Sequence, residues 1–525
     1  MRINRRNLLK AAGLSPLGFI PIQAVEVLAQ QGRTLVVASP GTPEGFDSDI
    51  LRGFTQHAVT QVYENLTRYG KVKQEGRIVY DPSVIEGHLA ESWKISDEGK
   101  KYLFTLRKNV RSFHGNELTA ADVEWSWAKS IALKRTGLFI ANAASVTSVK
   151  AITKYEVEFT LSAPNSLLLP LLTIYVPAIY DSTEVKKHAT TEDPWALKWI
   201  ESNTAGFGAY HLESLKAGEQ ATWVANPNYF GPKPYYSRVI SRAVPSAANR
   251  ATLLKGRQVH WIPQPPVQQV KDLQQDRNVK IESAAGRNLA SIRMNNTIKP
   301  FDDVRVRRAF IHAIDRNAIR KAVFLDTGLI ANSVVPPMVP GSDQSQFRYD
   351  YDPAKARKLL ADAGYADGIR IELNYTDEWW WPEPTAILVA AQLKEVGVTA
   401  VPTKITAAES RARTSLAKRD LPFFCFEEGP IALDPVYALV VAAQSTGVSN
   451  RVNYKNATLD TMVEESKRTL DPAKRLALVR EAQRLWAEDA PWIPLIYPNT
   501  FATMGVGVGG WVPDYIERWA ELRAA

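Results

Sequence analysis

Helix and strand patterns alternate along almost the whole chain. Tyr102, Phe104 and Leu106 occur at every second position, which predicts a half-buried strand. The segment 119–122, Thr-Ala-Ala-Asp, has the form of a capping box and predicts the start of a helix. Two further helices are predicted where Asp can cap the helix and Pro can take its first position, at Asp352-Pro353 and Asp471-Pro472. This interleaving predicts an α/β fold with mixed sheets.

The length and composition are those of a multidomain globular protein. A chain of 525 residues exceeds the size of a single hydrophobic core, which predicts two to four structural units. Hydrophobic residues make up 45% and charged residues 23%, which excludes disordered, collagen-like and multi-span membrane proteins. The single cysteine, Cys425, excludes a disulfide framework and a four-cysteine metal site.

The first 29 residues have the pattern of an export signal. Basic residues precede a mildly apolar stretch, 11–22, and Val27-Leu28-Ala29 then provides a small-residue cleavage site. The segment 4–10, with Arg5-Arg6 at its centre, resembles a twin-arginine export motif. The alternative is the ordinary basic start of a Sec signal. The apolar stretch is too short to span a bilayer.

Removal of this segment also changes the charge argument. It takes away four basic residues and Glu26, so the net charge falls from +9 to +6. No basic tract remains, and nucleic acid is therefore not an expected partner. A lipid anchor would need a cysteine at the cleavage site, where this chain has none. We therefore expect an exported, soluble, non-lipidated protein of a Gram-negative periplasm.

Catalytic and cofactor motifs are absent from the sequence. There is no Gly-x-Ser-x-Gly elbow and no P-loop, and the Gly-x-Gly-x-x-Gly match at 505–510 lies too near the C-terminus for a dinucleotide-binding unit. No two of the seven histidines are spaced i, i+2 or i, i+4, so no local metal pair exists. The sequence predicts a non-enzyme without a cofactor or metal. An exported hydrolase remains the rival interpretation from another class.

A series of blocks resembles the family 5 extracellular solute-binding proteins, which include the oligopeptide, dipeptide and nickel-binding proteins of ABC importers. The first block contains Trp93-Lys94-Ile95-Ser96-Asp97-Glu98-Gly99 and continues through Phe113-His114-Gly115 to residue 123. Later blocks keep the family's order and cover nearly all of the mature chain, at 206–210, 228–231, 301–316, 351–365 and 490–495.

The resemblance implies a periplasmic binding protein fold, in which two lobes are joined by two crossing strands and carry an extra inserted subdomain. The expected crossings lie near 291–296 and near 495–499. The implied division is an export signal at 1–29, lobe I at 30–60, 201–290 and 495–525, the inserted subdomain at 61–200, and lobe II at 291–494.

The resemblance also implies a mechanism and partners. A small solute, peptide-like or saccharide-like, would stabilise the closed arrangement of the lobes because it contacts both of them. The closed monomer would then dock on the ABC permease subunits of the inner membrane. No covalent chemistry is needed.

The residues that would bind the solute depart from the family pattern. In peptide-binding members an aspartate four residues before the Pro of an acidic-Pro pair holds the ligand's amino group. That pair is Asp434-Pro435 here, and the equivalent position is Ile431. The candidates for replacing the anchor are Glu427, Glu428 and Asp434.

The tryptophan run at 379–381 is the most unusual stretch of the chain. It follows a strand-like segment, 369–375, and precedes a helix expected to begin near Thr385, so it can face a cleft. Indole rings suit sugars, cations or aromatic groups. Trp379, Trp380 and Trp381 are therefore candidate ligand-binding residues, which keeps an oligosaccharide or opine-like conjugate open beside a peptide. Phe46 is a weaker candidate, and Trp261 is expected in the core.

Overall fold

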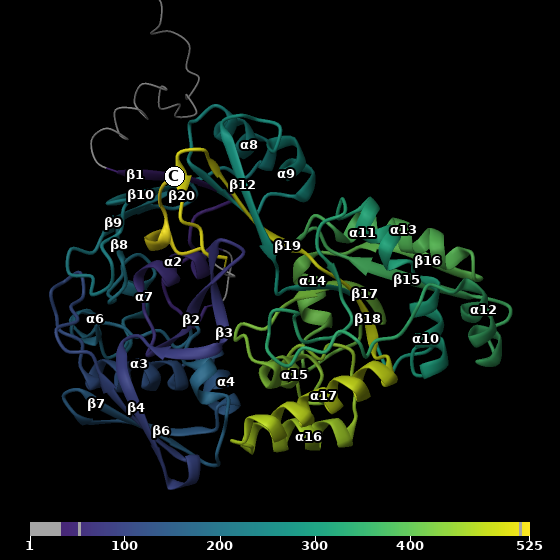
Figure 1. Cartoon of the computed structure of the whole chain (residues 1–525), viewed down its shortest axis with the longest axis horizontal. Coiled ribbons are helices and arrows are strands. Elements are labelled where there is room, and N and C mark those ends of the chain that lie inside the picture. The colour runs from purple at the N-terminus through teal and green to yellow at the C-terminus, as the bar shows by residue number, and fades with distance from the viewer. Residues whose placement is uncertain (1–32, 51–53, 514–516) are drawn as a thin grey trace, which may run out of the picture.

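The computed structural model describes residues 33–50, 54–513 and 517–525. It consists of two lobes lying side by side in Figure 1, one mainly purple to teal with the yellow C-terminal segment added to it, and the other running from teal through green to yellow. The predicted export signal, 1–29, lies outside the described residues. Among the described helices, none combines the length and the apolar character needed to cross a membrane.

The first lobe is built on a seven-stranded sheet. Its central strand, 34–39, runs parallel to both of its neighbours and is buried at every position, as expected for a strand covered on both faces. The sheet order is β12 (Val279–Ala285), β19 (Asn499–Gly505), β11 (Trp261–Pro263), β1 (Thr34–Ser39), β10 (Arg238–Ala243), β9 (Gln220–Ala225) and β8 (Tyr210–Lys216). Its helices are α2 (Thr55–Val62), α8 (Ala247–Lys255) and α9 (Val267–Leu273), and a short ribbon pairs β20 (Val508–Gly509) with β21 (Arg523–Ala524).

The same lobe has a second sheet, which is antiparallel throughout and lies below the first in Figure 1. Its order is β4 (Ala90–Ser96), β5 (Lys101–Leu106), β7 (Glu156–Leu161) and β6 (Val146–Thr153). Tyr102, Phe104 and Leu106 of β5 are all buried, which confirms the predicted alternation. Thr119 and Asp122 form the predicted capping box of α3. The remaining elements here are the hairpin β2 (Thr67–Gln74) and β3 (Arg77–Gly87), and α3 (Ala120–Ala132), α4 (Thr136–Ala143), α5 (Leu168–Leu171), α6 (Ser182–Lys186) and α7 (Leu197–Ile200).

The second lobe has a six-stranded mixed sheet. Asp352 and Asp471 each cap the helix that follows, and a proline takes the first position of that helix, as predicted. The sheet order is β14 (Leu329–Ile330), β18 (Trp492–Tyr497), β13 (Leu289–Met294), β17 (Phe423–Glu428), β15 (Ile369–Tyr375) and β16 (Val398–Lys404). The helices are α10 (Val304–Ala313), α11 (Arg316–Ala322), α12 (Pro353–Asp362), α13 (Pro382–Lys394), α14 (Ala407–Arg413), α15 (Pro435–Ala442), α16 (Ala457–Arg468) and α17 (Pro472–Asp489).

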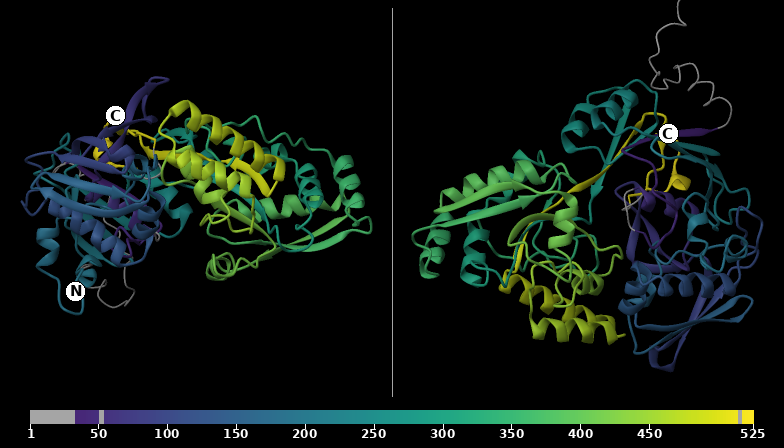
Figure 2. Two further views of the ribbon diagram at one scale, coloured as in Figure 1. Left: turned by 90° about the horizontal axis from the view of Figure 1, so that it is seen from below. Right: turned by 180° about the vertical axis from the view of Figure 1, so that it is seen from behind.

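The chain crosses between these sheets twice. One crossing is the short segment 286–288 between β12 and β13, and the other is Pro498 between β18 and β19. Figure 2 shows the second crossing as a continuous yellow path from one lobe to the other. The first crossing precedes the expected segment, 291–296, because β13 already pairs with β17 and β18 inside the second lobe.

The two crossings touch at Gly286. A Cβ atom built there would lie 2.0 Å from the carbonyl oxygen of Pro498, far inside van der Waals contact. Only glycine therefore lets the two segments lie this close together.

Gly286→Ala is expected to force the crossings apart and destabilise the protein by about 1–3 kcal/mol, the usual cost of overpacking. The measurement is the midpoint of thermal unfolding. Gly507→Ala is the matched control, because its added Cβ would meet no atom within 4 Å. Equal midpoints for the two variants would contradict the steric account.

Candidate functional site

A cavity of about 780 Å³ lies between the two lobes at the crossings. The first lobe contributes the β2–β3 hairpin, with Tyr69 and Arg77, and also Arg250 and Phe501. The second lobe contributes Phe324, Met338, Trp379 and Trp380 from loops that follow its strands and helices, and Glu427 from the end of β17. Residues 286–288 and 498 line the same space. A solute bound here would contact both lobes and the hinge between them.

The tryptophan run is divided between the cavity and the core. Trp379 and Trp380 are half-buried and line the cavity, where their rings pack edge-on against Phe426 and Phe324. Trp381 is fully buried beside them, immediately before α13. That helix begins at Pro382, ahead of the expected Thr385, because a proline suits the first turn.

Glu427 and Glu428 point to opposite faces of β17, as neighbours on a strand must. The Glu427 carboxylate lines the cavity and accepts hydrogen bonds from Asn288 Nδ2 at 3.1 Å and Trp381 Nε1 at 2.7 Å. Burial raises the pKa of Glu427, and these two hydrogen bonds oppose that rise. Glu428 forms an ion pair with the buried Arg293 instead, and does not line the main cavity.

The other predicted residues lie elsewhere. Asp434 caps α15 and forms an ion pair with Arg475 at 2.6 Å, so its carboxylate already has a cationic partner. Phe46 is fully buried in the first lobe, where it packs edge-on against Trp223, and it does not line the cavity. Trp261 is buried on β11. No ligand role is proposed for these three residues.

Three arginines on the cavity wall were not predicted. Arg77, Arg250 and Arg287 each donate a hydrogen bond to a main-chain carbonyl. Arg287 bonds the carbonyl oxygen of Ile431, at 3.3 Å. None of the three belongs to a recognisable motif, and only their positions in the fold bring them together. The wall therefore carries charges of both signs.

The lobes are in contact around and beyond the cavity. Tyr69 Oη accepts a hydrogen bond of 2.7 Å from the main-chain N–H of Leu433, which joins the two lobes at the cavity wall. Farther away, Ser166 N–H donates to Lys467 O at 2.7 Å, and Arg475 Nε donates to Ser166 Oγ at 3.1 Å. The arrangement is thus a closed one.

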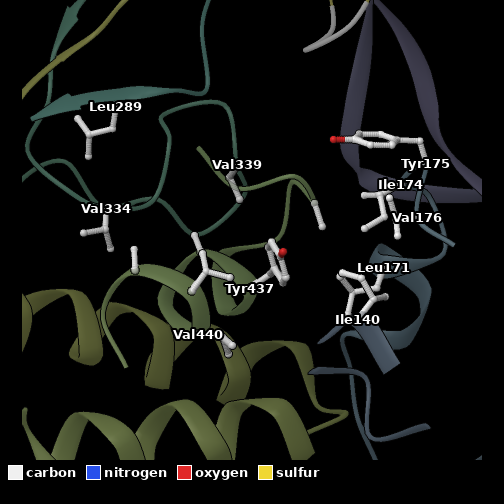
Figure 3. Packing of buried hydrophobic residues seen from close by; sticks show 14 of the residues in the cluster. Ile140, Leu171, Ile174, Tyr175, Val176, Leu289, Val334, Val339, Tyr437 and Val440 are labelled. Carbon is white, nitrogen blue, oxygen red and sulfur yellow. The ribbon is translucent and has the colours of Figure 1, made fainter. Parts of the chain in front are cut away.

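Apolar residues extend this contact. Figure 3 shows side chains of the first lobe near α4 and α5 facing side chains of the second lobe near α15. They belong to one buried cluster, which includes Ile140, Leu171, Val176, Val339, Tyr437 and Val440. Closure therefore buries apolar surface as well as forming hydrogen bonds.

The described residues contain no group of three or more His, Cys, Asp or Glu side chains placed to hold a metal ion. Burial raises the pKa of the Cys425 thiol far above its usual range, which suppresses the reactive thiolate. The cavity wall instead offers shape, aromatic rings and charge.

Comparison with known proteins gives a consistent result. The profile of the family "Bacterial extracellular solute-binding proteins, family 5 Middle" matches residues 84–450. Heme-binding protein A of Haemophilus influenzae is 27% identical over 515 residues, covering 93% of this chain and 91% of that protein. The dipeptide-binding protein of Escherichia coli is 26% identical over 543 residues, covering 96% of this chain and 97% of that protein.

A solved structure shows the same fold. The ABC transporter-associated periplasmic binding protein DppA from Helicobacter pylori, in complex with the peptide STSA, matches with a TM-score of 0.81 at 23% identity. The match covers 95% of this chain and 99% of that one.

Proposed function

Because the chain belongs to the bacterial extracellular solute-binding proteins of family 5, we propose that it captures a peptide-like solute in the interlobe cavity and delivers it to an ABC permease. The observation that carries the proposal is the cavity itself, which lies at both crossings and is lined by both lobes. The export signal at 1–29 would bring the protein to the periplasm as a soluble monomer.

The cavity wall suits a short peptide. Glu427 offers a negative group, while Arg77, Arg250 and Arg287 offer positive ones, so both ends of a zwitterion can be matched. The volume lies within the range of cavities that enclose small ligands. The dipeptide-binding relative supports the same class of solute.

Capture proceeds by hinge closure. The chain passes between the lobes at two short segments in the middle of the molecule, so a rotation there that separates the contacts between the lobes opens the cavity. A solute that contacts both lobes favours the closed form, because those contacts exist only there. The solute is bound and released unchanged.

Native mass spectrometry of residues 30–525, purified without refolding, tests the proposal. A retained adduct of peptide mass is the expected result. An adduct that has lost a chemical group relative to the added solute would indicate an exported hydrolase.

A saccharide or opine-like conjugate is the second candidate, because the half-buried rings of Trp379 and Trp380 line the cavity. Flat indole faces bind sugar rings as well as peptide side chains. A hexose-multiple or conjugate mass in the same experiment would favour this candidate.

Trp380→Ala is expected to weaken solute binding by about 1–2 kcal/mol, or roughly 5- to 30-fold in Kd, because it removes a large aromatic contact surface. Titration calorimetry with the retained solute measures the change. Trp93→Ala is the control, since Trp93 is also half-buried but packs against Phe104 outside the cavity. Unchanged affinity in the single alanine variants of all three tryptophans, Trp379, Trp380 and Trp381, would exclude a role for the run.

A further inference from the structure

Among the described residues that line the cavity, Glu427 is the only acidic residue that is not exposed, and it has no cationic partner. Asp377 pairs with Lys404 at 2.7 Å, and Glu378 pairs with Arg411 at 2.5 Å. Glu75 is exposed at the tip of the β2–β3 hairpin, where water solvates it. Within the described part of the chain, the side-chain hydrogen bonds of Glu427 are those with the neutral groups of Asn288 and Trp381.

The half-buried Glu427 carboxylate has only neutral hydrogen bonds and the water of the cavity to offset its charge. Ionised side chains removed from water are normally paired with an opposite charge, because neutral hydrogen bonds recover only part of the lost solvation. A solute that fills the cavity displaces the water that solvates this carboxylate, so the charge then needs a positive partner. The missing positive charge can come from the solute.

The surroundings favour a cation at this place. Trp379 and Trp380 line the same cavity, and aromatic faces attract ammonium groups. Trp381 is fully buried and donates its indole N–H to Glu427, which fixes the direction of the carboxylate. Trp381 is therefore a positioning residue for Glu427. At the position of the missing family anchor, Ile431 offers only a main-chain carbonyl, which Arg287 already occupies.

We propose that Glu427 forms an ion pair with a primary ammonium group of the solute, with Trp381 holding the carboxylate in place. This inference rests on the proposed function, and it specifies the solute as one that carries a free amine. In a peptide, that amine is the N-terminus. The negative partner then comes from β17 rather than from the loop that follows it.

The test uses two matched pools of di- and tripeptides, one with free amino termini and one N-acetylated. Native mass spectrometry shows which members bind the wild-type chain, and calorimetry measures the Kd of the tightest one. We expect the free-amine pool to bind and its acetylated counterparts to bind at least 30-fold more weakly. Glu427→Gln should lose a similar factor, because it keeps the shape and removes the charge.

Glu372→Gln is the matched control. Glu372 lies exposed on β15 of the same sheet and does not line the cavity, so its variant should bind within about 2-fold of the wild type. Trp381→Phe removes the hydrogen bond to Glu427 while keeping an aromatic ring, and should weaken free-amine peptides more than acetylated ones. Loss of both classes by the same factor would instead indicate a purely structural role for Trp381.

Proton release gives an independent readout. An ammonium ion beside Glu427 lowers the pKa of the carboxyl, so binding should release a proton at an acidic pH where the free protein holds that carboxyl partly protonated. Calorimetry in buffers of different ionisation enthalpy detects that release, and it should vanish in Glu427→Gln.

The outcomes distinguish a failure of this inference from a failure of the proposed function. Equal binding of both pools, unaltered in Glu427→Gln, would overturn the role of Glu427 and leave peptide capture standing. Binding of neither pool would overturn peptide capture, and the inference with it. A retained natural solute without an amine would overturn the inference alone.

Discussion

Lys129→Met is expected to destabilise the first lobe by about 3–5 kcal/mol, the cost of leaving buried charges without their partner. The Lys129 side chain is fully buried, with its ammonium 2.5 Å from Asp47 Oδ1 and 3.1 Å from Asp49 Oδ2. Both carboxylates are themselves buried. The partly exposed Arg135, 3.4 Å from Asp47, cannot balance two negative charges.

Urea unfolding followed by tryptophan fluorescence measures this loss. Lys150→Met is the control, since Lys150 forms an exposed ion pair with Glu124 in the same lobe and should cost less than about 1 kcal/mol. Adding Asp47→Asn to Lys129→Met should restore part of the stability, because one unpaired charge is removed. Similar losses in Lys129→Met and Lys150→Met would show that the buried cluster tolerates an uncompensated charge.

The second large effect is a loss of stability in acid, caused by Glu64. Burial alone would raise the pKa of this carboxyl, but its interactions with His88, at 2.9 Å, and Arg518, at 3.2 Å, outweigh burial and lower the pKa to about 2. A pKa depressed in the folded state contributes stability above the unfolded value near 4.5. That contribution, about 3 kcal/mol, is lost as the pH falls from about 5 toward 2.

Unfolding free energies measured between pH 6 and pH 2.5 test this expectation. At pH 6, Glu64→Gln should have a lower unfolding free energy than the wild type. That free energy should fall less steeply as the pH is lowered, because the amide has no proton to bind. Glu86→Gln is the control, since the exposed Glu86 pairs only with the exposed Arg68, at 3.5 Å. Parallel curves for the wild type and Glu64→Gln would assign the acid sensitivity to other groups.

The sequence predicts local structure best where a short motif supplies its own hydrogen-bond partners. Asp352, Asp471 and the Thr119 capping box each satisfy the free N–H groups of a helix start, which is a local matter. The first crossing was misplaced because strand pairing is not local. Residues 289–294 are a fully buried strand, and only their partners show to which sheet they belong.

The candidate site could be predicted only in part. Alternation on a strand separates Glu427 from Glu428 but does not say which of them faces the cavity. The run at 379–381 likewise has one member in the core and two on the wall, since a turn into α13 intervenes. Arg77, Arg250 and Arg287 come from distant segments, so no spacing in the sequence could unite them.

The hydrogen bonds of Ser166 with Lys467 and Arg475 join the lobes through residues that do not line the cavity. Because these residues lie outside the cavity, we expect the bonds to be independent of which solute is enclosed. By setting the share of molecules that close unaided, they multiply every dissociation constant by one common factor and leave the ratios between solutes unaltered. Overall affinity and selectivity between solutes are therefore set by different residues. Substitutions at these bonds would change the affinity for every solute without changing which solute is preferred.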